Sequence, residues 1–119
     1  MAQVLVAEDE AFTALALVDE LERLGHVVRD APDGAAALEV MRSFAPDVLV
    51  TDLMMPKVDG AALIRKVKAR PGPPIPVVLI TGVPEVKLPQ GLPYDAYIGK
   101  PVDYGKLGRT IDRLTKAAS

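Results

Sequence analysis

The sequence contains no cysteine, no tryptophan and a single histidine, and only 4% of its 119 residues are aromatic. Without cysteine there is no disulfide, no thiolate nucleophile and no zinc site built on sulfur. One histidine cannot form an imidazole metal cluster. Any metal ion bound by this chain therefore has to rest on oxygen ligands.

A strong net charge and a long apolar run are also missing. The 14 basic and 16 acidic residues leave a formal charge of −2, so we expect no cationic surface for nucleic acid and no nucleic-acid partner. No apolar run approaches the roughly 20 residues of a membrane span, and the first residues lack the pattern of a secretory signal. We therefore expect a cytoplasmic protein with no membrane partner.

Apolar residues make up 50% of the chain, enough to bury the core of one compact unit. We expect a single domain over residues 1–119, with no output domain. Five short runs rich in β-branched residues recur at fairly even spacing and predict strands. They are Gln3–Ala7, Val27–Arg29, Val48–Asp52, Val77–Thr81 and Ala96–Ile98.

Helical patterns separate most of these strands. Gly25 closes an apolar stripe after the first strand, and Asp33, Asp59 and Asp103 can cap the three helices that follow later. The apolar positions are Ala14, Leu17, Val18, Leu21 and Leu24, then Ala37, Met41 and Phe44 before Pro46, then Leu63, Ile64 and Val67 before Pro71, and finally Leu107, Ile111 and Leu114.

Continuously apolar strands that alternate with helices are typical of a parallel sheet buried on both faces. The sequence therefore predicts an α/β fold with a doubly wound sheet. In such sheets ligands bind beyond the carboxyl ends of the strands, so polar residues at those ends are the first candidates for a binding site.

The stretch between the fourth and fifth strands departs from this alternation. Pro84, Pro89 and Pro93 lie in it together with Gly82 and Gly91. A proline inside a helix costs on the order of 3 kcal/mol. We predict a loop with about one helical turn around Pro84–Lys87, so that a fourth helix is short or missing.

Acidic and polar residues stand at the predicted strand ends. Glu8-Asp9-Glu10 follow the first strand, Asp52 and Thr81 end the third and fourth, and Lys100 follows the fifth. Carboxylates brought this close repel one another unless a cation joins them, and Mg²⁺ takes carboxylates, waters and phosphate oxygens. With a lysine opposite, such a cradle suits a phosphoryl group that a carboxylate attacks.

Four segments of the chain resemble the ordered motifs of bacterial response-regulator receivers, the CheY-like domains of two-component signalling. They are VLVAEDE, VLVTDLMMPKVDG, VVLITG and AYIGKP. The resemblance covers essentially the whole chain. It implies a flavodoxin-like, three-layer α/β/α fold with five parallel strands in the order 2-1-3-4-5. The Thr81-Gly82 step resembles a subgroup of stand-alone receivers with a weak or missing fourth helix.

By that resemblance Asp52 is the phosphoacceptor, in a transfer that needs Mg²⁺ or, in its place, Mn²⁺. Asp9 would bind the metal directly, Glu8 mainly through metal-bound water, and Met54 through its backbone carbonyl. The phosphodonor would be a sensor histidine kinase or a histidine phosphotransfer protein, and a further protein would act downstream.

The resemblance also implies that Thr81 hydrogen-bonds the phosphoryl group, that Lys100 pairs with it, that Tyr97 is an aromatic switch residue and that Pro101 follows a cis peptide. Phosphorylation would draw Thr81 and the following loop inward and let Tyr97 reorient. Because Met54 and Val83 are apolar where water would approach, we also predict slow self-hydrolysis.

Other interpretations stay open. The chain could be a small Mg²⁺-dependent phosphatase that uses Asp52 as a transient nucleophile, although it has no cap or substrate-binding insertion, or a receiver that binds a partner without phosphorylation. Glu8-Asp9-Glu10 also fits an acidic helix start. The single histidine, His26, best fits a surface or packing role.

Overall fold

The computed structural model describes residues 1–55 and 57–116. Within them, five parallel strands form one sheet in the order β2-β1-β3-β4-β5, which confirms the predicted topology. The strands are β1 (Gln3–Ala7), β2 (Val27–Ala31), β3 (Val48–Asp52), β4 (Val77–Thr81) and β5 (Ala96–Gly99). The helices are α1 (Ala11–Arg23), α2 (Gly34–Val40), α3 (Gly60–Lys68) and α4 (Tyr104–Lys116).

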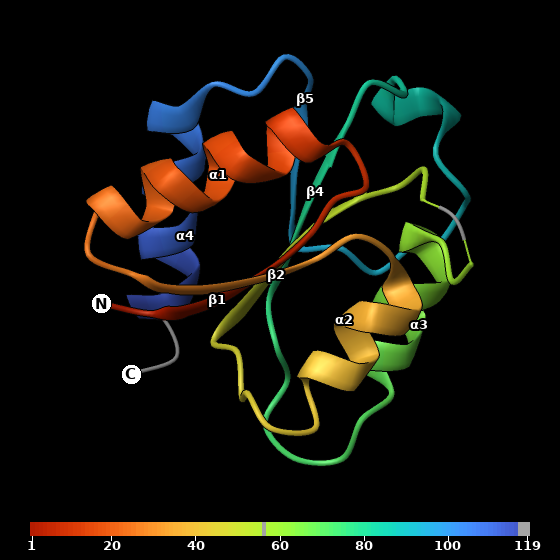
Figure 1. Ribbon diagram of the computed structural model, residues 1–119. Coiled ribbons are helices and arrows are strands. Elements are labelled where there is room, and N and C mark those ends of the chain that lie inside the picture. The colour runs from red at the N-terminus through yellow and green to blue at the C-terminus, as the bar shows by residue number, and fades with distance from the viewer. Residues whose placement is uncertain (56, 117–119) are drawn as a thin grey trace.

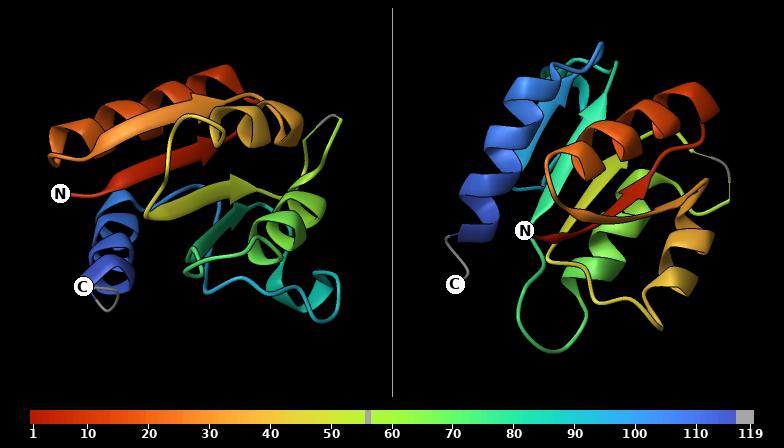
Figure 2. Two further views of the ribbon diagram at one scale, coloured as in Figure 1. Left: turned by 90° about the horizontal axis from the view of Figure 1, so that it is seen from below. Right: turned by 60° about the vertical axis from the view of Figure 1, so that its left-hand side comes forward.

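The helices form two layers, with α1 and α4 on one face of the sheet and α2 and α3 on the other (Figures 1 and 2). Side chains along each strand alternate between these layers. Leu5, Leu49 and Leu79 pack with α2 and α3, whereas Val6 and Val50 pack with α1 and α4. Because both faces are covered, β1, β3 and β4 are largely buried and apolar in sequence, whereas the edge strand β2 exposes most of its side chains.

Acidic residues cap the helices where the sequence predicts. Asp33, Asp59 and Asp103 each accept a hydrogen bond from the backbone N–H three residues further on, at 2.8, 2.9 and 3.0 Å. Gly25 follows α1 with a φ of +94°, the left-handed conformation that closes a helix and that glycine adopts without strain.

Two element boundaries differ from the prediction. Helix α2 ends at Val40, before Met41 and Phe44, because the chain enters a turn there that still directs both side chains into the core, each 6% exposed. Strand β2 continues past Arg29 to Ala31, where it still pairs with β1. Because this edge strand exposes most of its side chains, the apolar pattern does not show where the strand ends.

The segment after β4 is a loop with one 3₁₀ turn, Glu85–Lys87, as predicted, and it lies at the upper right of Figure 1. Leu88 and Leu92 hold it against the apolar layer of α2 and α3. The Lys100–Pro101 peptide bond is cis, as the resemblance implies. In the described residues, no helix has the length and apolar character needed to cross a membrane.

Candidate functional site

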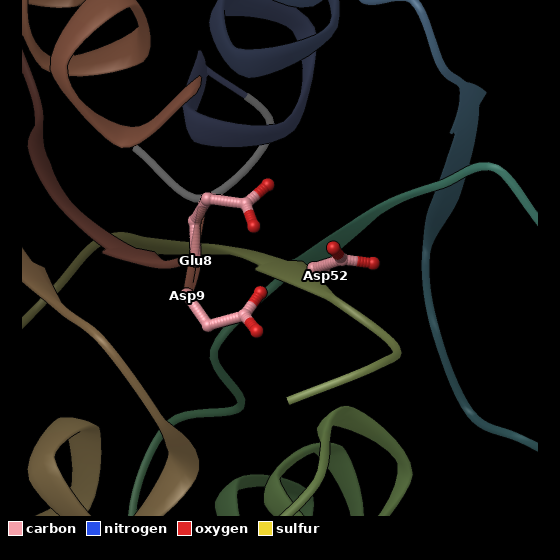
Figure 3. A group of neighbouring side chains, drawn as sticks. All are labelled: Glu8, Asp9 and Asp52. Carbon is pink, nitrogen blue, oxygen red and sulfur yellow. The ribbon is translucent and has the colours of Figure 1, made fainter. Parts of the chain in front are cut away.

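Three carboxylates meet at the carboxyl edge of the sheet. Glu8 and Asp9 directly follow β1, and Asp52 is the last residue of the neighbouring β3. Each offers an oxygen atom that lies within 4.8 Å of the other two. Figure 3 shows the carboxyl groups of Glu8 and Asp9 on the side that faces Asp52.

Lys100 joins two of these carboxylates. Its ammonium group lies 2.6 Å from Glu8 Oε1 and 2.8 Å from Asp52 Oδ2. The backbone N–H of Lys100 donates to the Thr81 carbonyl at 2.9 Å, so the pairing of β4 with β5 delivers the lysine to this edge. Burial alone would lower the pKa of Lys100, but its hydrogen bonds to Asp52 and Glu8 outweigh burial and raise it.

The carboxylate of Asp52 is held by donors on both oxygens. Oδ1 accepts a hydrogen bond from the Leu53 N–H at 2.6 Å and a longer one from the Met54 N–H at 3.4 Å, while Oδ2 faces Lys100. The residue is 6% exposed. Asp52 therefore presents a carboxylate of fixed orientation at the rim of the sheet.

The two acids after β1 have different environments. Glu8 is 2% exposed, and burial raises the pKa of its carboxyl although hydrogen bonds from Lys100 and the Glu10 N–H oppose the shift. Asp9 is exposed, and within the described residues its carboxylate has no hydrogen bond or ion pair. Three carboxylates with one ammonium leave two negative charges, which suits a divalent cation.

Thr81, Val83 and Tyr97 form a second connected group beside the carboxylates. Thr81 is buried at the end of β4, and its Oγ1 accepts a hydrogen bond from the Val83 N–H at 3.2 Å. The hydroxyl of Tyr97 on β5 donates to the Val83 carbonyl at 2.6 Å. Val83, the second residue of the loop after β4, is thus bound at both its N–H and its carbonyl.

The sequence model of the family described as "Response regulator receiver domain" matches residues 4–112 of the chain. The chain belongs to this family. It is a receiver domain of two-component, phosphorelay signalling, and the fold and the family that the sequence motifs suggest are both confirmed.

Relatives of this receiver include sensor kinases and transcriptional regulators. Sensor kinase CckA of Brucella abortus is 32% identical over 118 residues, which are 95% of this chain and 12% of that protein. Transcriptional regulatory protein AfsQ1 of Streptomyces coelicolor is 32% identical over 122 residues, with 98% and 51% covered. The receiver therefore spans at most about half the length of these relatives.

A solved structure agrees with this assignment. The signal receiver domain of a signal transduction histidine kinase from Syntrophus aciditrophicus superposes on the receiver with a TM-score of 0.88 at 28% identity. The alignment covers 98% of this chain and 92% of that one. The likeness therefore extends over the whole fold described above.

Glu10 does not join the carboxylates of the receiver, although it follows them in sequence. Its side chain caps α1 by accepting hydrogen bonds from the N–H groups of Phe12 at 3.2 Å and Thr13 at 2.8 Å. Hydrogen bonds from Thr13 lower the pKa of Glu10. Both interpretations of the acidic run therefore apply: Glu8 and Asp9 line the site, and Glu10 starts the helix.

Sequence reasoning missed one close contact at the site. Gly60, the first residue of α3, donates its N–H to the Leu53 carbonyl at 2.9 Å. A Cβ at this position would lie 2.0 Å from the Asp52 carbonyl oxygen. The Asp-Gly pair at 59–60 was the available signal, because a glycine directly after a helix cap often permits a close backbone approach.

His26 lies at the opposite edge of the sheet from the carboxylates. Its side chain is 5% exposed, and its Nδ1 accepts a hydrogen bond from the Ala2 N–H at 3.0 Å. This contact ties the residue before β1 to the turn before β2, in agreement with a packing role.

Proposed function

We propose that this receiver accepts a phosphoryl group on Asp52 from a phosphohistidine of a partner protein, in the presence of Mg²⁺ or Mn²⁺. The observation that carries the proposal is the Asp52 carboxylate, held by the Leu53 amide and by Lys100 with Glu8 and Asp9 beside it. A carboxylate restrained in this way is presented in one orientation to an incoming phosphorus atom.

In the transfer, a carboxylate oxygen of Asp52 attacks phosphorus and forms a P–O bond. The P–N bond of the phosphohistidine breaks, and the leaving imidazole keeps the electron pair and takes up a proton. Lys100 neutralises one phosphoryl oxygen. The Thr81 hydroxyl accepts its hydrogen bond from Val83 through oxygen, which leaves its proton available for a second phosphoryl oxygen.

Glu8, Asp9, Asp52 and the Met54 carbonyl would hold the cation. The donor set fits, because Asp9 has no partner among the described residues and the cluster carries two negative charges in excess. When bound, the cation supplies positive charge against the carboxylates and the phosphoryl oxygens. Tyr97 would report phosphorylation, since its hydroxyl binds the same loop residue as Thr81 does.

The partners that we propose are a sensor histidine kinase or a histidine phosphotransfer protein as donor, and a protein that binds the phosphorylated receiver downstream. We propose a signalling switch that assists its own phosphorylation and dephosphorylation, not an enzyme that turns over small phosphate esters. Loss of the output signal would then follow the chemical lifetime of the Asp52 phosphoryl group.

The test is incubation with acetyl phosphate and Mg²⁺, followed by intact mass, for the wild type and Asp52→Asn. We expect one phosphoryl adduct in the wild type that is lost in the variant and in the presence of a chelator. Rapid multiple turnover of the phosphate ester would indicate a phosphatase instead. No adduct with any donor would indicate a receiver that binds its partner without phosphorylation.

A further inference from the structure

We propose that Gly60 is a positioning residue for the carboxylate of Asp52: it lets the first turn of α3 pack directly on the Asp52–Leu53 peptide and so fixes the orientation of the acceptor. The inference rests on the proposed function at Asp52, because it assigns a role in that same phosphoryl transfer.

Two hydrogen bonds connect the helix to the carboxylate through one residue. The Gly60 N–H donates to the Leu53 carbonyl at 2.9 Å, and the Leu53 N–H donates to Asp52 Oδ1 at 2.6 Å. Leu53 is therefore bound at both its carbonyl and its N–H. Any displacement of the start of α3 would be transmitted to the amide that orients Oδ1.

The contact leaves no room for a side chain. A Cβ on Gly60 would lie 2.0 Å from the Asp52 carbonyl oxygen and 2.7 Å from Leu53 Cα, distances that real Cβ atoms essentially never show. Both obstacles belong to the backbone, which cannot move aside as a flexible side chain would. The φ of Gly60 is not positive, so the close approach alone, and not the backbone conformation, requires glycine here.

A larger residue would force either α3 away from β3 or the acceptor out of line with Lys100. A misplacement of about 1 Å of a reacting group can slow a reaction on the order of 100-fold. We therefore expect Gly60→Ala to retain the fold and to slow phosphorylation of Asp52 by about 10- to 100-fold.

Gly34 provides a matched control within the same chain. It is the first residue of α2, it follows the cap Asp33, and its N–H donates to the Val58 carbonyl at 2.9 Å. A Cβ there would lie 2.2 Å from that carbonyl oxygen. The two glycines thus share their local sequence, their cap and the severity of the clash, but only Gly60 abuts Asp52.

The experiment compares Gly60→Ala with Gly34→Ala for the rate of phosphorylation by acetyl phosphate at saturating Mg²⁺, at a temperature where both variants are folded by circular dichroism. We expect both to lose stability and Gly60→Ala to be slowed much more, because the Gly34 clash falls on Val58, two residues before Gly60, and not on the Asp52–Leu53 peptide itself. The ¹H–¹⁵N signal of the Leu53 amide should move further in Gly60→Ala than in Gly34→Ala, because only the Gly60 clash falls on Leu53 itself. Equal rates in the two variants, with the Leu53 signal unmoved, would overturn the proposal.

If Gly60→Ala does not fold, Asp59→Ala and Asp33→Ala allow the same comparison without added atoms, since each removes one helix cap. Asp59→Ala should slow phosphorylation more than Asp33→Ala, and equal rates would again contradict the role of Gly60. A wild type that forms no adduct would overturn the proposed function itself. If the wild type is phosphorylated but the two variants of each pair are phosphorylated at equal rates, only the positioning role of Gly60 is overturned.

Discussion

Glu8 has the least exposed side chain of the acids around Asp52. Burial raises the pKa of its carboxyl, and the negative charge of Asp52 adds to the shift, while hydrogen bonds from Lys100 and the Glu10 amide oppose it. A raised carboxyl pKa means that the folded state binds the proton more tightly than the unfolded chain does. The stability from this carboxyl is therefore complete below its unfolded pKa and is lost as pH rises through the folded pKa.

From this sign we expect Glu8→Gln without Mg²⁺ to be more stable than the wild type at neutral pH, with a gain that vanishes at acidic pH. The amide keeps an oxygen for Lys100 but carries no charge. Mg²⁺ affinity should fall by about 10- to 100-fold. Urea unfolding at both pH values and a Mg²⁺ titration measure the two effects. Glu22→Gln, at an exposed position of α1, controls for removing one negative charge, and a gain independent of pH would contradict the argument.

The lifetime of the phosphoryl group depends on the side chains that flank it. Met54 is 66% exposed and Val83 is half-buried, and neither can orient an attacking water. We expect Met54→Asn and Val83→Glu to shorten the lifetime roughly 10-fold, because a polar group that orients or deprotonates water assists hydrolysis. Decay of the adduct by intact mass after removal of the donor measures this, and decay at the wild-type rate would refute it.

The loop after β4 contains one 3₁₀ turn where the resemblance predicts a weak or missing fourth helix. We propose that this loop changes its conformation when Asp52 is phosphorylated. Two tyrosines hold it: Tyr97 donates to the Val83 carbonyl at 2.6 Å, and Tyr94 donates to the Glu85 carboxylate at 2.7 Å. The Tyr97 bond is partly buried and ends on backbone, whereas the Tyr94 bond is exposed. The first should therefore contribute more to the order of the loop.

We expect Tyr97→Phe to lower the hydrogen-exchange protection of the loop amides by about 1 kcal/mol, the net worth of one protein hydrogen bond, and Tyr94→Phe to have a smaller effect. The comparison keeps both rings and removes only the hydroxyl in each case. Hydrogen exchange followed by mass spectrometry of the peptides after β4 provides the measurement. A larger loss of protection in Tyr94→Phe would assign control of the loop to Glu85 instead.

Apolar periodicity predicts the strands and the loop of this fold but misplaces two element boundaries. It places all five strands and the loop, because buried strands and proline interruptions leave local marks. It extends α2 to Phe44, since a turn can bury the same positions as a helix, and it stops β2 at Arg29, since an edge strand exposes its polar residues. Burial pattern alone does not distinguish these cases.

For the whole molecule, the topology brings the candidate site together from positions that are distant in sequence. Strand ends predict which polar residues share an edge, and Glu8, Asp9, Asp52 and Lys100 do meet there. Sequence could not show that Lys100 binds Glu8 as well as Asp52, or that Gly60 abuts the acceptor. Both depend on the distance between packed elements, which no local pattern encodes.

Asp95 connects several elements at the edge of the sheet opposite Asp52. Its Oδ2 accepts from Lys68 Nζ at 2.6 Å and from the Val77 N–H at 2.7 Å, while Lys68 also donates to the Ile75 carbonyl at 2.9 Å. A single carboxylate therefore joins helix α3, the proline-rich segment 71–76 and the start of β4. Removing it leaves the Val77 N–H without this acceptor and the Lys68 ammonium with the Ile75 carbonyl alone.

We expect Asp95→Ala to lower the free energy of unfolding by about 1–3 kcal/mol, as urea denaturation would measure. Below its unfolding transition, however, its rate of phosphorylation by acetyl phosphate should stay within about twofold of the wild type. The reason is distance along β4: Asp95 binds at the residue where that strand starts, whereas Lys100 and the carboxylates lie beyond its other end. A rate that falls together with stability would mean that the two edges of the sheet move as one unit.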